Sequence, residues 1–501
     1  MNTIRIENFR SIEDSGVVEI APITVIVGKN SAGKSSFVRL FPLIKQTVEK
    51  RIAESMLWYG DYVDLGDFEH AVGRKKSDHP IVMAFSLDVE PRRYYYAVRE
   101  EKDYHFNANV SIAICKKHFK YVTIEIADQI IKIEMNQDGT VSDVWINDDN
   151  QIMKQFELKW YREAGDLLPY LWIARKDETS GKNYLDRFEG DSLTPQIRKL
   201  IYGEKNHKSE VGYARRIISE VIIGEKEKIL LQLKEKNEKK YGKMTVKNKQ
   251  FIECNNYILT SYITFLLEEI NSTISINMRQ MNYIKPIRAM VDRYYRVQGI
   301  SIDEVDADGS NLPMILHNMS PNDLLNFEKW CKEKFGVVFS VDSSEGHISL
   351  VIKDDVNGTE VTNLADTGYG YSQMLPIVVL LWMFHKKPSL RAGITKTIVI
   401  EQPELHLHPA YQAKLIDVFV NILKEARGKN IKLNIIFETH SEAMINRIGA
   451  LISSKKLEHQ WVNILVFDKE NDITTVSSKT FNDKGLLKGW PIGFFAPDEV
   501  R

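Results

Sequence analysis

The sequence predicts an α/β fold with a mixed or mainly parallel core sheet, an antiparallel β lobe and a helical insertion. Apolar, β-branched segments that end in glycine or in an acid predict the core strands. Alternating segments separated by turns predict the antiparallel lobe, and a long charged, helix-prone stretch predicts the insertion. The expected domains are an N-terminal lobe at 1–165, the helical insertion at 166–275 and a C-terminal lobe at 276–501.

Length and composition fit more than one globular lobe and give no general attraction to nucleic acid or lipid. The 501 residues exceed what one hydrophobic core usually holds, and 43% of them are hydrophobic. With a net charge of −1, any contact with nucleic acid must come from a local patch. Cys115, Cys254 and Cys331 lie far apart, and no run has the character of a signal peptide or a membrane span. We therefore expect a cytoplasmic protein without a membrane partner.

A phosphate-binding loop follows the first core strand. Residues 4–10 alternate in strand fashion, and the apolar run ITVIVG ends at Gly28. The loop GKNSAGKS then matches G-x-x-x-x-G-K-[ST] with Gly28, Gly33, Lys34 and Ser35, and an amphipathic helical pattern follows it. In this motif backbone N–H groups surround the phosphates, the lysine reaches the β- and γ-phosphates, and the serine hydroxyl ligates Mg²⁺. A nucleotide and Mg²⁺ are therefore expected.

The middle of the chain changes pattern once. From about 80 to 160, alternating segments and NQDGT-like turns predict an antiparallel meander. From about 165 the pattern changes to helix, and heptads are not sustained, so we expect a short helical insertion instead of a coiled-coil arm. Its basic stretch at 234–249 is either a solvated helical face or a nucleic-acid contact, because clustered lysines neutralise phosphates.

An arginine and tyrosine cluster lies just after the insertion. Its members are Arg288, Arg293, Tyr294, Tyr295 and Arg296. Two roles stay open for it: the arginines join the insertion to the second lobe, or the cluster forms a subunit or ligand surface, where arginine and tyrosine are enriched.

A glycine-containing turn opens a long apolar helix in the C-terminal lobe. The turn carries Thr367, Gly368 and Gly370. A helix N-terminus with glycines and a hydroxyl suits a γ-phosphate offered by a second subunit.

Two further strands end in polar side chains. KTIVIE ends at Glu401, placed to hold Mg²⁺ directly or through water. NIIFETHS ends a third strand at Glu438, followed by His440. The carboxyl ends of parallel strands are where ligands bind in open α/β sheets, so these ends are expected to meet the nucleotide.

The order of these motifs resembles the ABC-type ATPase heads of the RecF, structural-maintenance-of-chromosomes and OLD group, which have the P-loop NTPase fold. Residues 4–37 resemble the N-terminal strands and Walker A of that group. The segments 364–375, 397–409 and 436–441 resemble its signature motif, its Walker B with D-loop and its His switch. In addition, 283–299 and 489–500 resemble bacterial stand-alone ATPases of anti-phage systems, including the PtuA component of Septu and retron-associated Septu.

The resemblance implies a role for each matching residue. In such heads two subunits hold two ATP molecules between them, so a dimer or higher oligomer is implied. Glu401 takes the metal-associated position, and His440 contacts the γ-phosphate or orients the attacking water. The residues implied to line the phosphates are Asn30, Ser31, Ala32, Gly33, Lys34, Ser35 and Ser36, with Thr367, Gly368 and Gly370 of the other subunit.

The sequence departs from this group at the catalytic base. The base normally follows the metal acid directly, and here that position is Gln402. An amide does not accept a proton as a carboxylate does, although general-base help is worth only about 10²–10⁴-fold. Glu404 is a candidate substitute that acts through a water. We therefore expect ATP hydrolysis to ADP and phosphate, but slow hydrolysis.

Two other segments leave a role open. Residues 59–73 lie where a Q-loop is expected but contain no glutamine, so Asp67 and Glu69 are the candidate sensors of the γ-phosphate. His406 and His408 form an H-x-H pair, for which a D-loop that crosses between subunits is favoured over a metal half-site.

The biological role follows from the resemblance. The sixty or so residues after His440 contain no Toprim-type acidic cluster and no HNH spacing, so any nucleic-acid cleavage is expected from a separate nuclease subunit. The leading hypothesis is a sensor and scaffold that regulates that nuclease in bacterial anti-phage defence. The alternative is a DNA-repair or chromosome-maintenance ATPase that clamps DNA directly. A transporter-type ATPase is disfavoured, because such subunits lack so long a helical insertion.

Overall fold

The described part of the chain forms two compact units. The computed structural model describes residues 1–52, 54–90, 105–176, 183–188, 193–202, 221–299, 302–344, 346–386, 395–470, 473–487 and 489. The first unit comprises Met1–Val18 and Leu43–Arg279, and the second comprises Glu19–Pro42 and Gln280–Arg501. The phosphate-binding loop therefore belongs to the same unit as the C-terminal motifs. The three-part division expected from the sequence stays a prediction, and most of the segment 489–500 lies outside the described residues.

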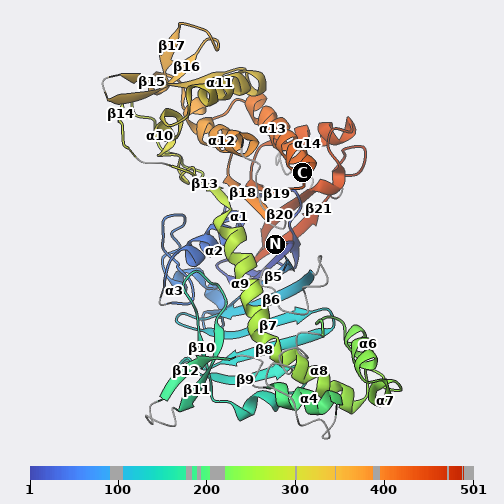
Figure 1. Cartoon of the computed structure of the whole chain (residues 1–501). Helices are drawn as coiled ribbons and strands as arrows, with labels where there is room; N and C mark the ends of the chain where they lie inside the picture. Colours follow the sequence, from blue (N-terminus) through green and yellow to red (C-terminus); the bar gives the residue numbers. More distant parts are fainter. Residues whose placement is uncertain are drawn as a thin grey trace. The chain divides into compact units, whose positions relative to one another are not determined.

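The first unit is built on an antiparallel sheet. Strand β1 pairs with β2 and with β5, and the strands β5 to β9 pair in chain order, as the alternating pattern predicts. Helix α9 runs across these strands (Figure 1). The bounds of the strands are β1 Thr3–Phe9, β2 Ile12–Asp14, β3 Val18–Glu19, β5 Ile81–Val89, β6 Phe106–Ile114, β7 Phe119–Ile126, β8 Gln129–Met135 and β9 Val141–Ile146.

The prediction that helix begins near residue 165 is wrong for residues 170–176 and 183–187. Strands β10 (Leu158–Tyr161), β11 (Tyr170–Lys176) and β12 (Asn183–Arg187) form a small antiparallel sheet in that region. The β11 sequence YLWIARK is rich in aromatic and β-branched residues, which favour a strand paired on both sides. The charged residues of the neighbouring segments make this strand pattern hard to recognise in the sequence.

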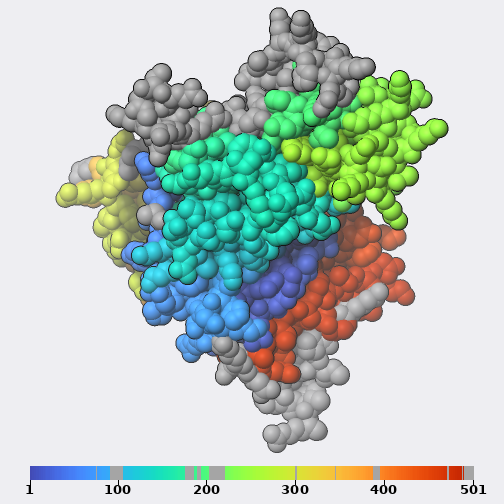
Figure 2. Space-filling model, turned by 90° about the horizontal axis from the view of Figure 1, so that it is seen from below, coloured from blue at the N-terminus to red at the C-terminus, as the bar shows by residue number. Residues whose placement is uncertain are grey.

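Helices follow from residue 194 onward. The longest described helix of the expected insertion is α9, with 17 residues. In Figure 2 the light-green segment that includes α6 and α7 lies beside the teal sheet residues, to which it is joined by a hydrogen bond from Lys226 N to Asp128 Oδ1 of 2.9 Å. The bounds are α2 Leu40–Glu49, α3 Phe68–Ala71, η1 Arg74–Lys76, η3 Ile152–Gln155, α4 Thr194–Tyr202, α6 Lys226–Lys236, α7 Glu238–Tyr241, α8 Lys249–Ser261 and α9 Ile263–Arg279.

The second unit contains the parallel sheet. Strands β13, β18, β19, β4 and β20 lie side by side in this order and are parallel, and β21 returns antiparallel to β20. Strands β4 and β19 are almost entirely buried, which is typical of a sheet covered on both faces. The bounds are β4 Ile23–Gly28, β13 Asn282–Ile284, β18 Thr395–Glu401, β19 Lys432–Glu438, β20 Val462–Glu470 and β21 Ile473–Lys479. The predicted α/β fold class is confirmed.

Helices and a small second sheet complete the second unit. Helix α1 contacts β4, β18 and β19, and α12, α13 and α14 lie together next to the strands (Figure 1). The bounds are α1 Lys34–Val38, β14 Tyr295–Arg296, α10 Leu312–His317, α11 Pro321–Phe335, β15 Val338–Ser344, β16 His347–Lys353, β17 Val361–Asn363, η5 Leu364–Asp366, α12 Tyr369–Lys386, α13 Pro409–Gly428, α14 Glu442–Ser453 and η6 His459–Trp461. Among the described residues, no helix is long and apolar enough to cross a membrane, and the three cysteines are unpaired.

Candidate nucleotide-binding site

The phosphate-binding loop has the backbone conformation of a tight turn between β4 and α1. Gly33 has a φ of 93° and Ser31 a φ of 62°, so the backbone turns through left-handed conformations there. At Gly28 a Cβ atom would lie only 2.2 Å from the Phe467 carbonyl oxygen, so no larger residue fits. Asn30 and Ser31 are exposed at the surface of the loop, whereas Ala32 is buried. The exposed face of the loop is therefore open to a ligand.

Lys34 and Ser35 both face Glu438, at the end of β19. The Ser35 hydroxyl donates to Glu438 Oε2 at 2.8 Å, and Lys34 Nζ lies 3.9 Å from Glu438 Oε1. Lys34 Nζ also donates to the Lys29 carbonyl at 2.7 Å. Burial lowers the pKa of Lys34, although the Glu438 charge opposes this. The sequence predicts Glu438 at a strand end but indicates no role for it there.

Glu401 lies on the next strand, β18, and is bound by two side chains. Arg39 donates to both of its oxygens, with distances of 2.9 Å from Nε to Oε1 and 3.0 Å from Nη2 to Oε2. The Tyr283 hydroxyl donates to Oε1 at 2.5 Å. Only 1% of Glu401 is exposed. The carboxylate expected to bind metal therefore has a bidentate arginine as its partner.

Glu404 connects the segment after β18 to the His440 backbone. Its Oε1 accepts from His440 N at 2.7 Å, while its Oε2 is buried and has no hydrogen-bond partner among the described residues. Burial raises the pKa of Glu404. His440 follows β19, and burial and the Lys34 charge lower its pKa. A carboxylate with a raised pKa is suited to accept a proton.

Gln402 and Arg288 meet at the same strand end. Gln402 has a φ of 46°, and its backbone N donates to the Glu438 carbonyl at 2.9 Å. Arg288 donates to the carbonyls of Glu401 and Gln402 at 3.1 and 3.3 Å. Burial lowers the pKa of the Arg288 guanidinium to about 10, while the Glu404 charge opposes this. Its Nε and Nη1 are buried without a hydrogen-bond partner among the described residues.

The glycine turn contacts the segment after β18 and is partly open. The Thr367 hydroxyl donates to the Leu364 carbonyl at 2.7 Å, and a Cβ at Gly370 would lie 2.7 Å from the His406 carbonyl. A Cβ at Gly368 would meet no atom within 4 Å. Gly368 is therefore exposed, with open space next to its Cα atom.

The remaining polar candidates have local partners. Asp67 caps α3 by accepting from His70 N at 3.0 Å, and Glu69 pairs with Lys116. His408 caps α13, with its Nδ1 accepting from Ala410 N at 3.3 Å. No group of three or more metal-ligating side chains occurs within the described ranges. The sensor role of Asp67 or Glu69 and the D-loop role of His406 and His408 stay predictions.

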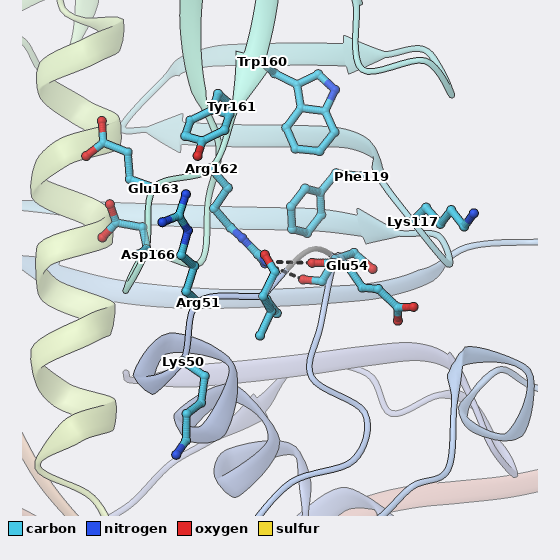
Figure 3. A pocket seen from close by; sticks show the side chains of 13 residues that line it. Lys50, Arg51, Glu54, Lys117, Phe119, Trp160, Tyr161, Arg162, Glu163 and Asp166 are labelled. Atoms are coloured by element: carbon cyan, nitrogen blue, oxygen red, sulfur yellow. Dashed lines mark hydrogen bonds between the residues drawn. The ribbon is translucent and has the colours of Figure 1, made fainter.

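A separate cavity of about 550 Å³ lies within the first unit, between basic and aromatic side chains (Figure 3). Arg162, on its wall, donates to the carbonyls of Ser55 and Glu54 at 2.6 Å each. These bonds fix the loop that contains Glu54 and Ser55 at the edge of the cavity. Burial lowers the pKa of the Arg162 guanidinium to about 10. Lys50 also lines the cavity, and its Nζ lies 3.4 Å from Oδ2 of Asp61. None of the predicted site residues lines this cavity.

The structure thus brings together most of the predicted residues of one subunit and adds four others. The phosphate-binding loop, Glu401, Gln402, Glu404 and His440 converge at the carboxyl ends of β4, β18 and β19. The additional residues are Arg39, Tyr283, Arg288 and Glu438. Glu438 had a usable signal, an acid at the end of a core strand, and Arg288 was indicated as a member of the arginine and tyrosine cluster. Arg39 and Tyr283 owe their position to tertiary packing.

Comparisons with known proteins agree with a nucleotide site. The AAA ATPase domain family matches residues 1–445. No curated protein matches the chain.

Among solved structures, heads of SMC proteins align over almost the whole chain. An Smc head bound to the C-winged helix domain of ScpA has 10% identity and a TM-score of 0.34, and covers 96% of this chain and 97% of that chain. The Pyrococcus furiosus Smc head with an extended coiled coil, bound to the C-terminal domain of ScpA, has 11% identity, a TM-score of 0.34 and 96% coverage of both chains. The Thermotoga maritima SMC head has 9% identity and a TM-score of 0.33, and covers 95% of this chain and 97% of that chain.

The family match spans far more than half of the chain and includes the phosphate-binding loop, the glycine turn and the strand ends that carry Glu401 and Glu438. It therefore covers the segments that carry the candidate site residues. The chain belongs to the AAA ATPase domain family and is an ATPase of that type.

Proposed function

We propose that this chain binds ATP with Mg²⁺ at the phosphate-binding loop and hydrolyses it slowly. The convergence of Lys34 and Ser35 with Glu438 at the carboxyl end of β19 carries this proposal. Backbone N–H groups of the loop and the Lys34 ammonium would bind the phosphates, and Ser35 would ligate the metal. Mg²⁺, when bound, neutralises charge on the β- and γ-phosphates. The buried carboxylate beside Ser35 fits a cation, because oxygen atoms are the preferred ligands of Mg²⁺.

The attacking water would be positioned by groups at the ends of β18 and β19. Gln402 can donate or accept a hydrogen bond but is a poor proton acceptor. Glu404 is the proposed base, since its Oε2 has no hydrogen-bond partner among the described residues and its pKa is raised by burial. His440, whose backbone is bound by Glu404, would contact the γ-phosphate or orient the water.

A second copy of the chain would complete the site. The open position of Gly368 and the 62% exposure of Tyr369 leave the N-terminus of α12 free to approach a γ-phosphate. Further exposed apolar side chains, Ile287, Met290 and Tyr294, lie in the loop between β13 and β14. Arg293 of that loop is paired with Asp366, directly before the glycine turn. We propose that this surface contacts the second copy.

Binding of ATP tests the first part of the proposal. Changing Lys34 to Ala removes a charged donor to the phosphates, which is worth about 1.5–3 kcal/mol, or about tenfold to a hundredfold in Kd. A fluorescent ATP analogue measures Kd by anisotropy for the parent, for Lys34→Ala and for Lys424→Ala, an exposed lysine on α13. Circular dichroism checks that each variant is folded. If Lys34→Ala binds ATP as tightly as Lys424→Ala, the proposed site is wrong.

For the biological role, we propose a sensor and scaffold that regulates a separate nuclease subunit in anti-phage defence. Its support is the resemblance of the sequence to ATPases of such systems. The alternative is a DNA-maintenance ATPase that clamps DNA directly, for which the exposed Lys239, Lys243 and Lys247 of the basic stretch are candidate contacts. Neighbouring genes separate the two: a nuclease or reverse-transcriptase gene supports defence, and recombination genes support repair.

A further inference from the structure

The two carboxylates at the ends of β18 and β19 occupy the same level of the sheet but different strands. Glu401 and Glu438 are direct partners across the parallel pair of β18 and β19. Glu438 is also the partner of Ile26 on β4, the strand that leads into the phosphate-binding loop. Neighbouring strands lie about 4.8 Å apart, so Glu401 is one strand further from that loop than Glu438.

The two carboxylates also differ in how their charge is compensated. Arg39 binds both oxygens of Glu401, and bidentate arginine pairs are among the strongest charge-assisted contacts. Tyr283 adds a third hydrogen bond. A metal ion at Glu401 would have to displace these donors or share the carboxylate with them.

The charge of Glu438 is less well compensated than that of Glu401. Its carboxylate faces Ser35, the proposed Mg²⁺ ligand. It accepts one neutral hydrogen bond, from Ser35, and its nearest ammonium, Lys34, is 3.9 Å away. Only 2% of Glu438 is exposed. A buried carboxylate of this kind is costly unless a cation or further donors bind it. The Lys34 ammonium is expected to turn to the phosphates when ATP binds, which would leave Glu438 without a cation.

We infer that Glu438, and not Glu401, supplies the carboxylate that faces a Mg²⁺ ion held at the Ser35 hydroxyl. Glu401 is then a positioning residue. Its bond to Arg39 joins the end of β18 to the residue that follows α1, and so helps to fix the loop that surrounds the phosphates. This inference rests on the proposed ATP–Mg²⁺ site and assigns its metal-facing side chain. It changes the role that the sequence alone predicts for Glu401.

The experiment measures metal binding directly, with Mn²⁺ in place of Mg²⁺. Free Mn²⁺ is followed by its electron paramagnetic resonance signal, in the presence of a non-hydrolysable ATP analogue. The variants are Glu438→Gln, Glu401→Gln and the control Glu333→Gln, whose side chain is 70% exposed on α11. Glutamine at 438 still accepts from Ser35, so the fold is expected to persist. Thermal unfolding checks each variant.

We expect Glu438→Gln to weaken Mn²⁺ binding by tenfold or more, since even outer partners of metal ligands are worth about 10–100-fold. Glu401→Gln should change the Mn²⁺ affinity less than threefold and should instead lower the unfolding temperature, because Arg39 loses its charged partner. Equal Mn²⁺ affinity of Glu438→Gln and Glu333→Gln, or a larger loss in Glu401→Gln than in Glu438→Gln, would overturn the inference. If the parent protein binds no nucleotide, the proposed function itself fails, which is a different result.

Discussion

At the scale of single residues, the rate of hydrolysis depends on which side chain accepts the proton of the attacking water. Gln402 lies at the end of β18 with its backbone N bound to the Glu438 carbonyl, a bond that a change of side chain leaves in place. Gln402→Glu should raise ATP turnover by tenfold or more, because general-base catalysis contributes about 10²–10⁴-fold. Phosphate release at saturating ATP measures the change, with Glu333→Gln as the control. A rate no higher than that of the control would mean that base strength at 402 does not limit turnover.

Glu404 is the second residue whose charge is predicted to affect the rate. Glu404→Gln keeps an oxygen that accepts from His440 N, so the position of His440 is preserved while the proton acceptor is lost. We expect single-turnover hydrolysis to fall by at least tenfold while ATP affinity changes less than threefold. An unchanged rate would exclude Glu404 as the base and leave it a positioning residue for His440. Gln402→Glu combined with Glu404→Gln should restore the rate if the new carboxylate takes over the role.

At the scale of elements, Ser441 ties α14 to the site. Its hydroxyl oxygen accepts from Met444 N at 3.1 Å as the helix cap, and the hydroxyl donates to Gln412 Oε1 of α13 at 2.5 Å. Replacing a capping serine by alanine usually costs about 1 kcal/mol, or about fivefold in a local opening equilibrium. Ser441→Ala should therefore speed amide exchange in the first turn of α14 about fivefold. Ser453→Ala, at the other end of the helix, should leave that turn unchanged, and equal exchange in both variants would contradict the prediction.

The order of the strands explains which parts of the site can be read from the sequence. The phosphate-binding loop and the acid-tipped strands are local patterns, so Gly28, Lys34, Ser35 and Glu401 are recognisable without a structure. That β19 lies between β18 and β4 is a tertiary fact, and it alone brings Glu438 to Ser35. The local sequence pattern also gave a wrong prediction at β11. There, pairing with β10 and β12 favours a strand although the neighbouring segments are charged.

At the scale of the whole molecule, the distribution of the site among segments constrains how the chain works. Residues 19–42 and the segment after 280 form one unit, so the site of one chain is assembled from pieces that are far apart in the sequence. The partners of Arg39 show this clearly, since Glu401 and its neighbour Tyr283 come from segments more than two hundred residues later. Truncating either of these segments would therefore remove part of the site.

The proposed second copy gives the last prediction. With Mg²⁺ and a non-hydrolysable ATP analogue, sedimentation velocity should show the parent chain shifting to a dimer or higher oligomer, because phosphates would bridge the loop of one copy and the glycine turn of the other. Gly368→Glu should abolish the shift, since a carboxylate at this position faces the phosphates of the second copy. A Cβ at Gly368 meets no atom within 4 Å, so the single chain should fold and bind ATP as before. Gly428→Glu, at another position with open space around the Cβ, is the matched control and should assemble like the parent. Assembly of Gly368→Glu to the same extent as Gly428→Glu would exclude the glycine turn from the contact, and with it the shared nucleotide site.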